Sequence, residues 1–209
     1  MTLDLPPKVA TIRFDVDGDI LLMLFSDEGR AQFQVSSSAL CLASPVFRAM
    51  LGAKGKFKES KDLQEKKGCE PPLEITLSDD DPKALAIILR IIHHQHEHVP
   101  ESLAEENLWQ IAILVDKYDL REATMIWINL WVKPYLNSDI APSSYFTGDR
   151  GIFLAYVFSN EDLFQSISKD IILTWVCTPD IPQLHPGDST TADSFQFVPQ
   201  LIVGKYIFL

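Results

Sequence analysis

The stretch from Asp19 to Met50 constrains the fold more than any other part of the sequence, because its pattern changes from that of strands to that of helices. Ile20 to Phe25 is an unbroken apolar run, and Ala31 to Val35 alternates around Phe33. The residues between them, Ser26 to Gly29, are typical of turns. The two runs therefore predict a β-hairpin with at least one buried face.

Two short helices are predicted to follow this hairpin. The serines at positions 36 to 38 can accept hydrogen bonds from the free N–H groups of a first helical turn. Pro45 would break a single helix, but after Ser44 it is well placed as the first residue of a second one. The residues that continue at helical spacing are Leu40, Cys41, Ala43, Ser44, Val46, Phe47, Met50 and Leu51.

The remaining elements are read from the same signals. We expect an edge strand within Val9 to Phe14, a further strand from Leu73 to Leu77, and a long polar connection from Gly52 to Pro72. Further helices are predicted after Ser78 to Pro82, from a Ser102/Glu105 capping box, over Met125 to Val132 with an end by Pro134, and over 152–158 and 161–176. The helix from Met125 to Val132 is apolar almost all round and is expected to be central. The fold class is therefore α+β: a small, mainly three-stranded sheet flanked by short helices, with a C-terminal helical extension.

The order of these elements resembles the BTB/POZ domain, of the type common in fungi. The matching motifs are Gly18-Asp19-Ile20, Phe33-x-Val35-Ser36-Ser37, Leu40-x-x-Ala43-Ser44-Pro45-x-Phe47-x-x-Met50, Phe57-Lys58-Glu59, Leu77-x-Asp79-Asp80-Asp81-Pro82-x-Ala84-Leu85 and Leu114-x-Asp116-Lys117-Tyr118-Asp119. The resemblance covers residues 9–133. The helices over 134–177 resemble the helical extension that often follows such a domain. Pro6-Pro7 predicts a loose N-terminal arm over 1–8, and a stretch rich in Pro, Asp and Thr predicts a linker with an apolar C-terminal segment over 178–209.

Charge and cysteine content exclude several functions. The net charge of −11 disfavours nucleic acid and anionic membranes as partners. The three cysteines, Cys41, Cys69 and Cys177, have neither the number nor the spacing of a disulfide framework or a zinc site. Since neither a leader-like segment nor a membrane-length apolar run occurs, we expect a cytoplasmic and/or nuclear location. The lysines between 54 and 67 predict a solvated loop, with a nuclear import signal as the alternative.

The histidines are the most suggestive chemical cluster in the sequence. His93, His94, His96 and His98 could hold a transition metal, but no carboxylate or thiolate at a standard ligand spacing completes such a site. At the end of a helix they also complement the helix dipole without any ligand. We therefore expect no metal and no cofactor. Signatures of hydrolases, P-loop proteins and dinucleotide enzymes do not occur, so the chain is not expected to be an enzyme.

The resemblance implies a non-enzymatic protein-protein interaction module. One form is a substrate adaptor for a cullin-type ubiquitin ligase, and the alternatives are a self-assembling scaffold or transcription-associated protein without a ligase role and, more remotely, a hydrolase. In the family, an apolar-x-Glu motif after the helical hairpin contacts the cullin, and Phe57-Lys58-Glu59 matches it in type and position. The alternative role for Phe57 is to anchor a polar loop to its own core.

A homodimer is also expected. In the family, a strand-initial aspartate and a histidine at the start of the first helix mark a charged pocket of the dimer interface; Asp19 matches the first, but Ser36 stands at the second position. The N-terminal strand would otherwise leave an exposed sheet edge. The residues expected in self-association are Val9, Ile12, Phe14, Asp19, Ser36 and Leu40.

Overall fold

The computed structural model describes residues 11–26, 29–66, 71–136 and 148–177. The chain divides into two compact units, the first reaching Trp127 and the second beginning at Ile128. The boundary between the units lies inside helix α6 (Arg121–Leu136), and the predicted end of the domain at residue 133 falls within the same helix.

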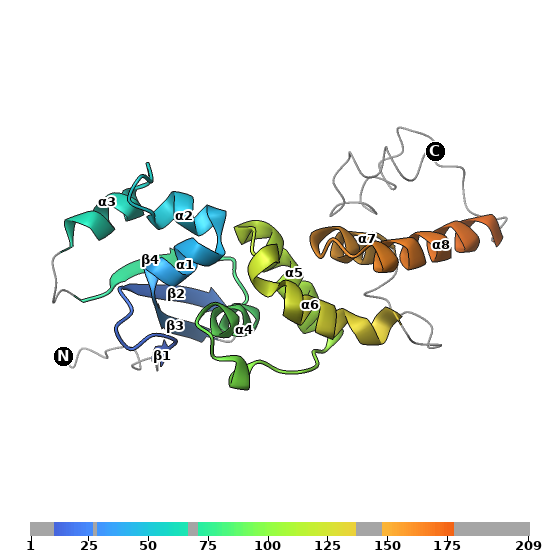
Figure 1. The fold of residues 1–209 in the computed structure, drawn as a ribbon, viewed down its shortest axis with the longest axis horizontal. Coiled ribbons are helices and arrows are strands. Elements are labelled where there is room, and N and C mark those ends of the chain that lie inside the picture. The colour runs from blue at the N-terminus through green and yellow to red at the C-terminus, as the bar shows by residue number, and fades with distance from the viewer. Residues whose placement is uncertain (1–10, 27–28, 67–70, 137–147, 178–209) are drawn as a thin grey trace, which may run out of the picture. The chain divides into compact units, whose positions relative to one another are not determined.

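The first unit is built on a mixed four-stranded sheet (Figure 1). Its strands are β1 (Thr11–Arg13), β2 (Ile20–Ser26), β3 (Gly29–Val35) and β4 (Leu73–Leu77), in the order β1-β3-β2-β4. The predicted hairpin is β2 and β3, and β1 is an edge strand that runs parallel to β3. The predicted α+β class is confirmed. The short strand β1 adds a fourth strand to the mainly three-stranded sheet that the sequence predicts.

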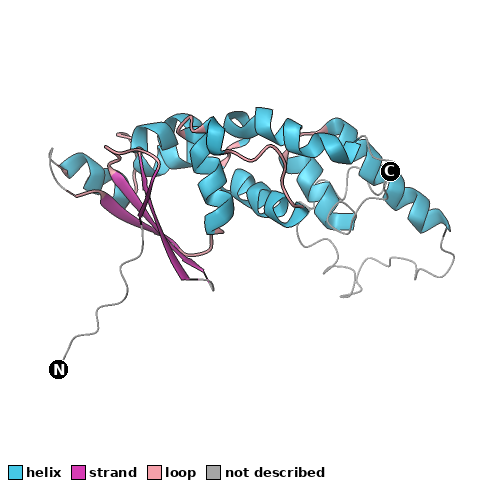
Figure 2. Ribbon diagram, turned by 90° about the horizontal axis from the view of Figure 1, so that it is seen from below, coloured by secondary structure: helices cyan, strands magenta, loops and turns pink. Residues whose placement is uncertain are grey.

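Alternation within the strands buries one face of the sheet. Leu22 pairs with Phe33 on one side and with Ile75 on the other, and all three side chains are buried. Their neighbours Gln32, Glu74 and Thr76 remain at least partly accessible. Figure 2 shows the strands as one layer with helices grouped beside them. The apolar set of each strand therefore fixes the register, because a shift by one residue would turn it outward.

The helical hairpin forms as the sequence predicts. Helix α1 (Ser37–Ala43) is capped by the Ser36 side chain, which accepts from the N–H of Ala39. Helix α2 (Pro45–Leu51) begins at Pro45 and is capped by Ser44, whose hydroxyl accepts from the N–H of Phe47 at 3.0 Å. Ser44 is fully buried, and its hydroxyl also donates to the carbonyl of Tyr118. One residue thus ends α1 through its backbone, starts α2 through its side chain and bonds to a distant part of the chain.

The polar stretch after this hairpin is not one long connection, as predicted, but contains helix α3 (Lys58–Glu65). Side-chain hydrogen bonds to residues of the preceding turn, 8 and 11 positions away in the sequence, stabilise helix α3. The buried Ser60 hydroxyl donates to the carbonyl of Gly52 at 2.7 Å, and the Gln64 amide donates to the carbonyl of Ala53 at 3.0 Å. These bonds hold the helix against the end of α2.

Helices α4 (Pro82–Ile92) and α5 (Glu105–Tyr118) follow β4, with a 3₁₀ turn η1 (His96–His98) between them. Asp81 caps α4 by accepting from the N–H of Ala84 at 2.7 Å. The predicted capping box at Ser102 is wrong, because α5 begins only at Glu105 and its N-cap residue, Ala104, has no side-chain hydrogen bond.

Asp80 has a role that the sequence did not reveal. Its side chain is fully buried and accepts hydrogen bonds from the Tyr118 hydroxyl and from Lys117 Nζ at 2.6 Å. Burial and the neighbouring Asp80 carboxylate raise the pKa of Tyr118, so the phenol stays protonated and donates. The turn between β4 and α4 is thereby fastened to the end of α5.

The C-terminal helices are α6, α7 (Gly148–Val157) and α8 (Glu161–Cys177). Helix α6 continues to Leu136, past the predicted end at Pro134, which lies in its last turn. It is not central on all sides, since Ile128, Trp131 and Val132 are buried while Ile126 is 80% exposed. Helices α7 and α8 agree with the predicted pair. The predicted segments 1–8 and 178–209 lie outside the described residues.

Replacing Ser44 with alanine tests the junction of α1 and α2. The variant loses the cap of α2 and leaves the buried Tyr118 carbonyl without its donor, so we expect the free energy of unfolding to fall by about 2 to 3 kcal/mol. Urea unfolding of the purified chain measures this loss.

Ser38→Ala is the matched control, because Ser38 is an exposed serine on α1. Its stability should stay within about 0.5 kcal/mol of the parent. Equal losses in the two variants would contradict the assigned role of Ser44.

Candidate functional site

The turn between α2 and α3, from Gly52 to Phe57, is held closely against α2. The N–H of Gly55 donates to the carbonyl of Gly52 at 2.7 Å. A Cβ atom built on Gly55 would lie 2.6 Å from the carbonyl oxygen of Ala49, so only glycine allows this approach. Together with the Ser60 and Gln64 bonds, this fixes the position of the turn.

Phe57 ends this turn with an exposed ring. It occupies the N-cap position of α3, and 56% of its surface is accessible. Lys58 is exposed as well, while Glu59 is half-buried in the first turn of α3. The turn is held by Ser60 and Gln64, and the alternative role of Phe57 as an anchor to the core stays a prediction. The predicted motif therefore follows the turn directly, with Phe57 and Lys58 exposed.

A shallow groove of about 550 Å³ lies beside Phe57. Pro45, Arg48 and Ala49 of α2 form one wall, and the turn from Gly52 to Phe57 forms the other. The Arg48 guanidinium is held in place, since it donates to the carbonyl oxygens of Cys41 at 2.9 Å and Leu42 at 3.3 Å. This groove and the Phe57 ring are called the Phe57 surface below.

The residues predicted for self-association do not form one surface. Ile12 on β1 is 46% exposed, but Phe14 and Leu40 are buried, so their side chains belong to the core and not to the surface expected of them. Phe14 packs edge-on against Phe33 with 5.4 Å between ring centroids. Val9 lies outside the described residues.

Asp19 and Ser36 instead support the start of α1. The Asp19 carboxylate accepts from the N–H of Ser37 at 2.7 Å and from its hydroxyl at 2.6 Å. The Ser36 hydroxyl caps the helix, and its own N–H donates to His93 Nε2 at 3.1 Å. Asp19 is exposed, so the same carboxylate remains accessible from outside.

Leu42 was missed by sequence reasoning. It is 80% exposed on α1, and Val46 of α2 is 39% exposed. The signal was available, because at 100° per residue Leu42 points almost opposite to the buried Leu40. An exposed leucine on a short helix is a candidate contact for a protein partner.

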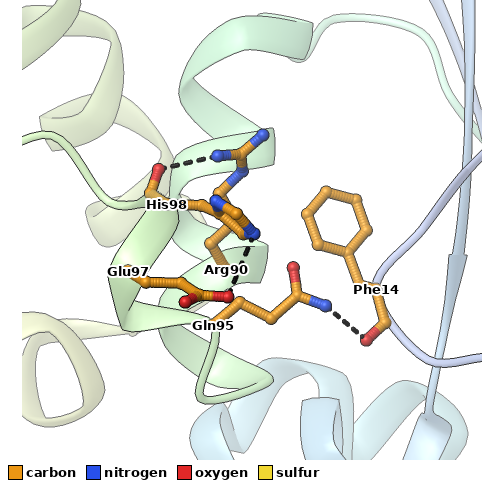
Figure 3. Close-up of polar contacts among 5 residues, drawn as sticks. All are labelled: Phe14, Arg90, Gln95, Glu97 and His98. Atoms are coloured by element: carbon orange, nitrogen blue, oxygen red, sulfur yellow. Dashed lines mark hydrogen bonds and ion pairs between the residues drawn. The ribbon is translucent and has the colours of Figure 1, made fainter.

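The four histidines make different contacts. Ring contacts place His94 against His96 at 5.6 Å and His96 against Trp127 at 5.9 Å, while His98 lies 3.3 Å from Glu97. Figure 3 shows the polar contacts at the end of α4, where Arg90 donates to the carbonyl of His98 and Gln95 donates to the carbonyl of Phe14. Within the described ranges, no three histidine, cysteine or acidic side chains gather as metal ligands do.

His93 differs from the other three because it is half-buried and bonded through both ring nitrogens. Nδ1 lies 2.9 Å from the carbonyl oxygen of Leu89 and Nε2 accepts from the N–H of Ser36. These contacts require the neutral ring with its proton on Nδ1. The ring therefore joins the end of α4 to the start of α1.

The part of the chain that the structure describes contains no helix long and apolar enough to cross a membrane. Cys41 is half-buried, and burial raises the pKa of its thiol, which disfavours the reactive thiolate. The side chains exposed near the hairpin are those of Phe57, Leu42 and several lysines.

Comparison with known proteins agrees with this arrangement. The family model of the BTB/POZ domain matches residues 19–128, more than half of the chain. The match begins just before β2 and includes the hairpin α1 and α2, the Phe57 surface and α5. No curated protein matches the chain.

His93 predicts how stability depends on pH. Burial lowers its pKa below the ordinary 6.5, and this outweighs the opposite effects of the Leu89 hydrogen bond and of Asp15. The unfolded chain therefore binds the proton first as the pH falls. We expect the His93 contribution to be complete above about pH 6.5 and to be lost as the pH falls from there toward the lowered pKa.

Urea unfolding at a series of pH values from neutral to mildly acidic measures this effect. His93→Gln keeps an acceptor for Ser36 but does not titrate, so its stability should decline less with falling pH than that of the parent. His98→Gln, at an exposed histidine, is the control and should follow the parent. Parallel curves for the parent and His93→Gln would contradict the role given to His93.

Proposed function

The chain belongs to the BTB/POZ domain family, whose domain is a protein-protein interaction module, and we propose that it serves as a substrate adaptor for a cullin-type ubiquitin ligase. The observation that carries the proposal is the exposed Phe57 ring at the start of α3, directly after the helical hairpin. Phe57-Lys58-Glu59 would make the contact with the cullin.

The structure supports this role through the rigidity of the turn. Side-chain bonds from Ser60 and Gln64 hold the turn before the partner arrives, so little conformational entropy is lost when Phe57 enters a pocket. An exposed aromatic side chain that becomes buried in this way contributes about 2 kcal/mol or more. The Glu59 carboxylate, in the first turn of α3, would orient the contact by accepting hydrogen bonds.

A BTB domain is typically not catalytic, and we extend this to the whole chain, with no metal or cofactor. The family match is to the BTB/POZ domain in general, and the fungal type stays a prediction. An adaptor role is consistent with the expected cytoplasmic and/or nuclear location.

Phe57→Ala tests the adaptor role by co-purification with a cullin scaffold. Because the ring is exposed, we expect the midpoint of thermal unfolding to shift by less than about 2 °C. Loss of a buried contact of about 2 kcal/mol should weaken binding about thirtyfold. Calorimetric titration of the cullin with each variant measures this difference.

Phe25→Ala is the matched control, because Phe25 on β2 is another large aromatic residue that is 39% exposed. It should leave cullin binding unchanged. Unchanged binding after Phe57→Ala, or a loss of several degrees with a proportional loss of binding, would count against the adaptor role.

Self-association is the second candidate function, as a scaffold or a transcription-associated protein without a ligase role. It is favoured by Leu42, which is 80% exposed on α1, and by Ile12 on the edge strand β1. A second copy that covers both would bury apolar surface and close the sheet edge.

Multi-angle light scattering tests this function. We expect a dimer at about ten micromolar and above, and Leu42→Glu should shift it to monomer by placing a charge in the interface. Ile126→Glu is the control, because Ile126 on α6 is equally exposed, at 80%. A monomeric parent, or the same shift in both variants, would contradict an interface at α1.

A further inference from the structure

The Phe57 surface is positively charged in a chain that is strongly negative overall. The net charge of the chain is −11. The charged residues that line the groove are all cations: Arg48, Lys54 and Lys56. Phe57, Pro45 and Ala49 supply its apolar part. Basic and apolar groups thus lie side by side over a short distance.

The lysines of the groove are available for a partner. Lys54 and Lys56 are exposed, and within the described part of the chain neither has an ion-pair partner. The Arg48 guanidinium donates its hydrogen bonds to carbonyl oxygens at the end of α1. Its positive charge still lies at the exposed wall of the groove.

The shape of the turn keeps these charges beside Phe57. A Cβ atom on Gly52 would lie 2.4 Å from the carbonyl oxygen of Arg48, and one on Gly55 would lie 2.6 Å from that of Ala49. Both glycines let the turn fold back onto α2, so Lys54 and Lys56 do not extend away from the protein on a free loop.

We propose that the Phe57 surface binds an acidic segment of the protein partner, with an apolar side chain against Phe57 and Pro45 and glutamate or aspartate carboxylates opposite Lys54 and Lys56. This inference rests on the proposed function in assuming that the surface meets a protein. Charges beyond about 8 Å are largely screened at physiological salt, so the three cations that line the groove act more strongly on a segment bound in it than the net negative charge of the whole chain does.

The test uses two short synthetic peptides that share one central leucine and differ only in four positions, which are glutamate in one peptide and glutamine in the other. Binding to the full chain is followed by fluorescence anisotropy. We expect the glutamate peptide to bind at least about fivefold more tightly at about 50 mM salt, and this preference to fall below about twofold at about 500 mM.

Charge reversal identifies the residues responsible. Lys54→Glu/Lys56→Glu lowers the net charge by four, from −11 to −15, and should abolish the preference for the glutamate peptide. Lys133→Glu/Lys169→Glu changes exposed lysines of α6 and α8 by the same amount and should retain it. Circular dichroism verifies that both variants are folded.

Equal affinity for the two peptides, no binding of either, or loss of the preference in both double variants would overturn the inference. These results are separable from the adaptor role. If Phe57 is required for cullin binding but the peptides are not distinguished, the groove inference alone fails. If the peptides are distinguished but no cullin binds, the adaptor role alone fails.

Discussion

The arrangement of the BTB domain depends on the two hydrogen bonds of the Ser44 hydroxyl. It accepts from the first turn of α2 and donates to the carbonyl of Tyr118 at the end of α5. The Phe47 ring stacks on the Tyr118 ring with 4.5 Å between centroids, and the Tyr118 hydroxyl donates to the buried Asp80. The hairpin, the end of α5 and the turn before α4 are therefore linked through one buried residue, Tyr118.

This linkage determines what the hairpin leaves exposed. Because Leu40, Phe47 and Leu51 are drawn into the core, Leu42 has to point outward and the turn after α2 has to lie at the surface. The exposure of Leu42 is thus a consequence of core packing, while the Ser60 and Gln64 hydrogen bonds hold the turn that presents Phe57. A polar bond in the core, where the dielectric constant is low, makes this arrangement specific as well as stable.

Sequence reasoning succeeded where a structure is set by neighbouring residues. The caps at Ser36 and Ser44, the helix start at Pro45, the apolar run of β2 and the alternation of β3 depend on residues a few positions apart. It failed where contacts between residues far apart in the sequence determine the structure. Helix α3 was missed because Ser60 and Gln64 bond to the preceding turn, and Phe14 and Leu40 were assigned to a surface because burial depends on tertiary packing.

Arg48 connects the two candidate surfaces. Its guanidinium donates to the carbonyl of Leu42, beside the surface proposed for self-association, and the same side chain lines the groove beside Phe57. A substitution at Arg48 would free the end of α1 and also remove charge from the groove, so its effect on either interaction cannot be assigned to one surface. Lys54 and Lys56 bear charge without holding the hairpin, and Leu42 is exposed without lining the groove. The two modes of association are therefore separable through these residues, even though one short hairpin supports both.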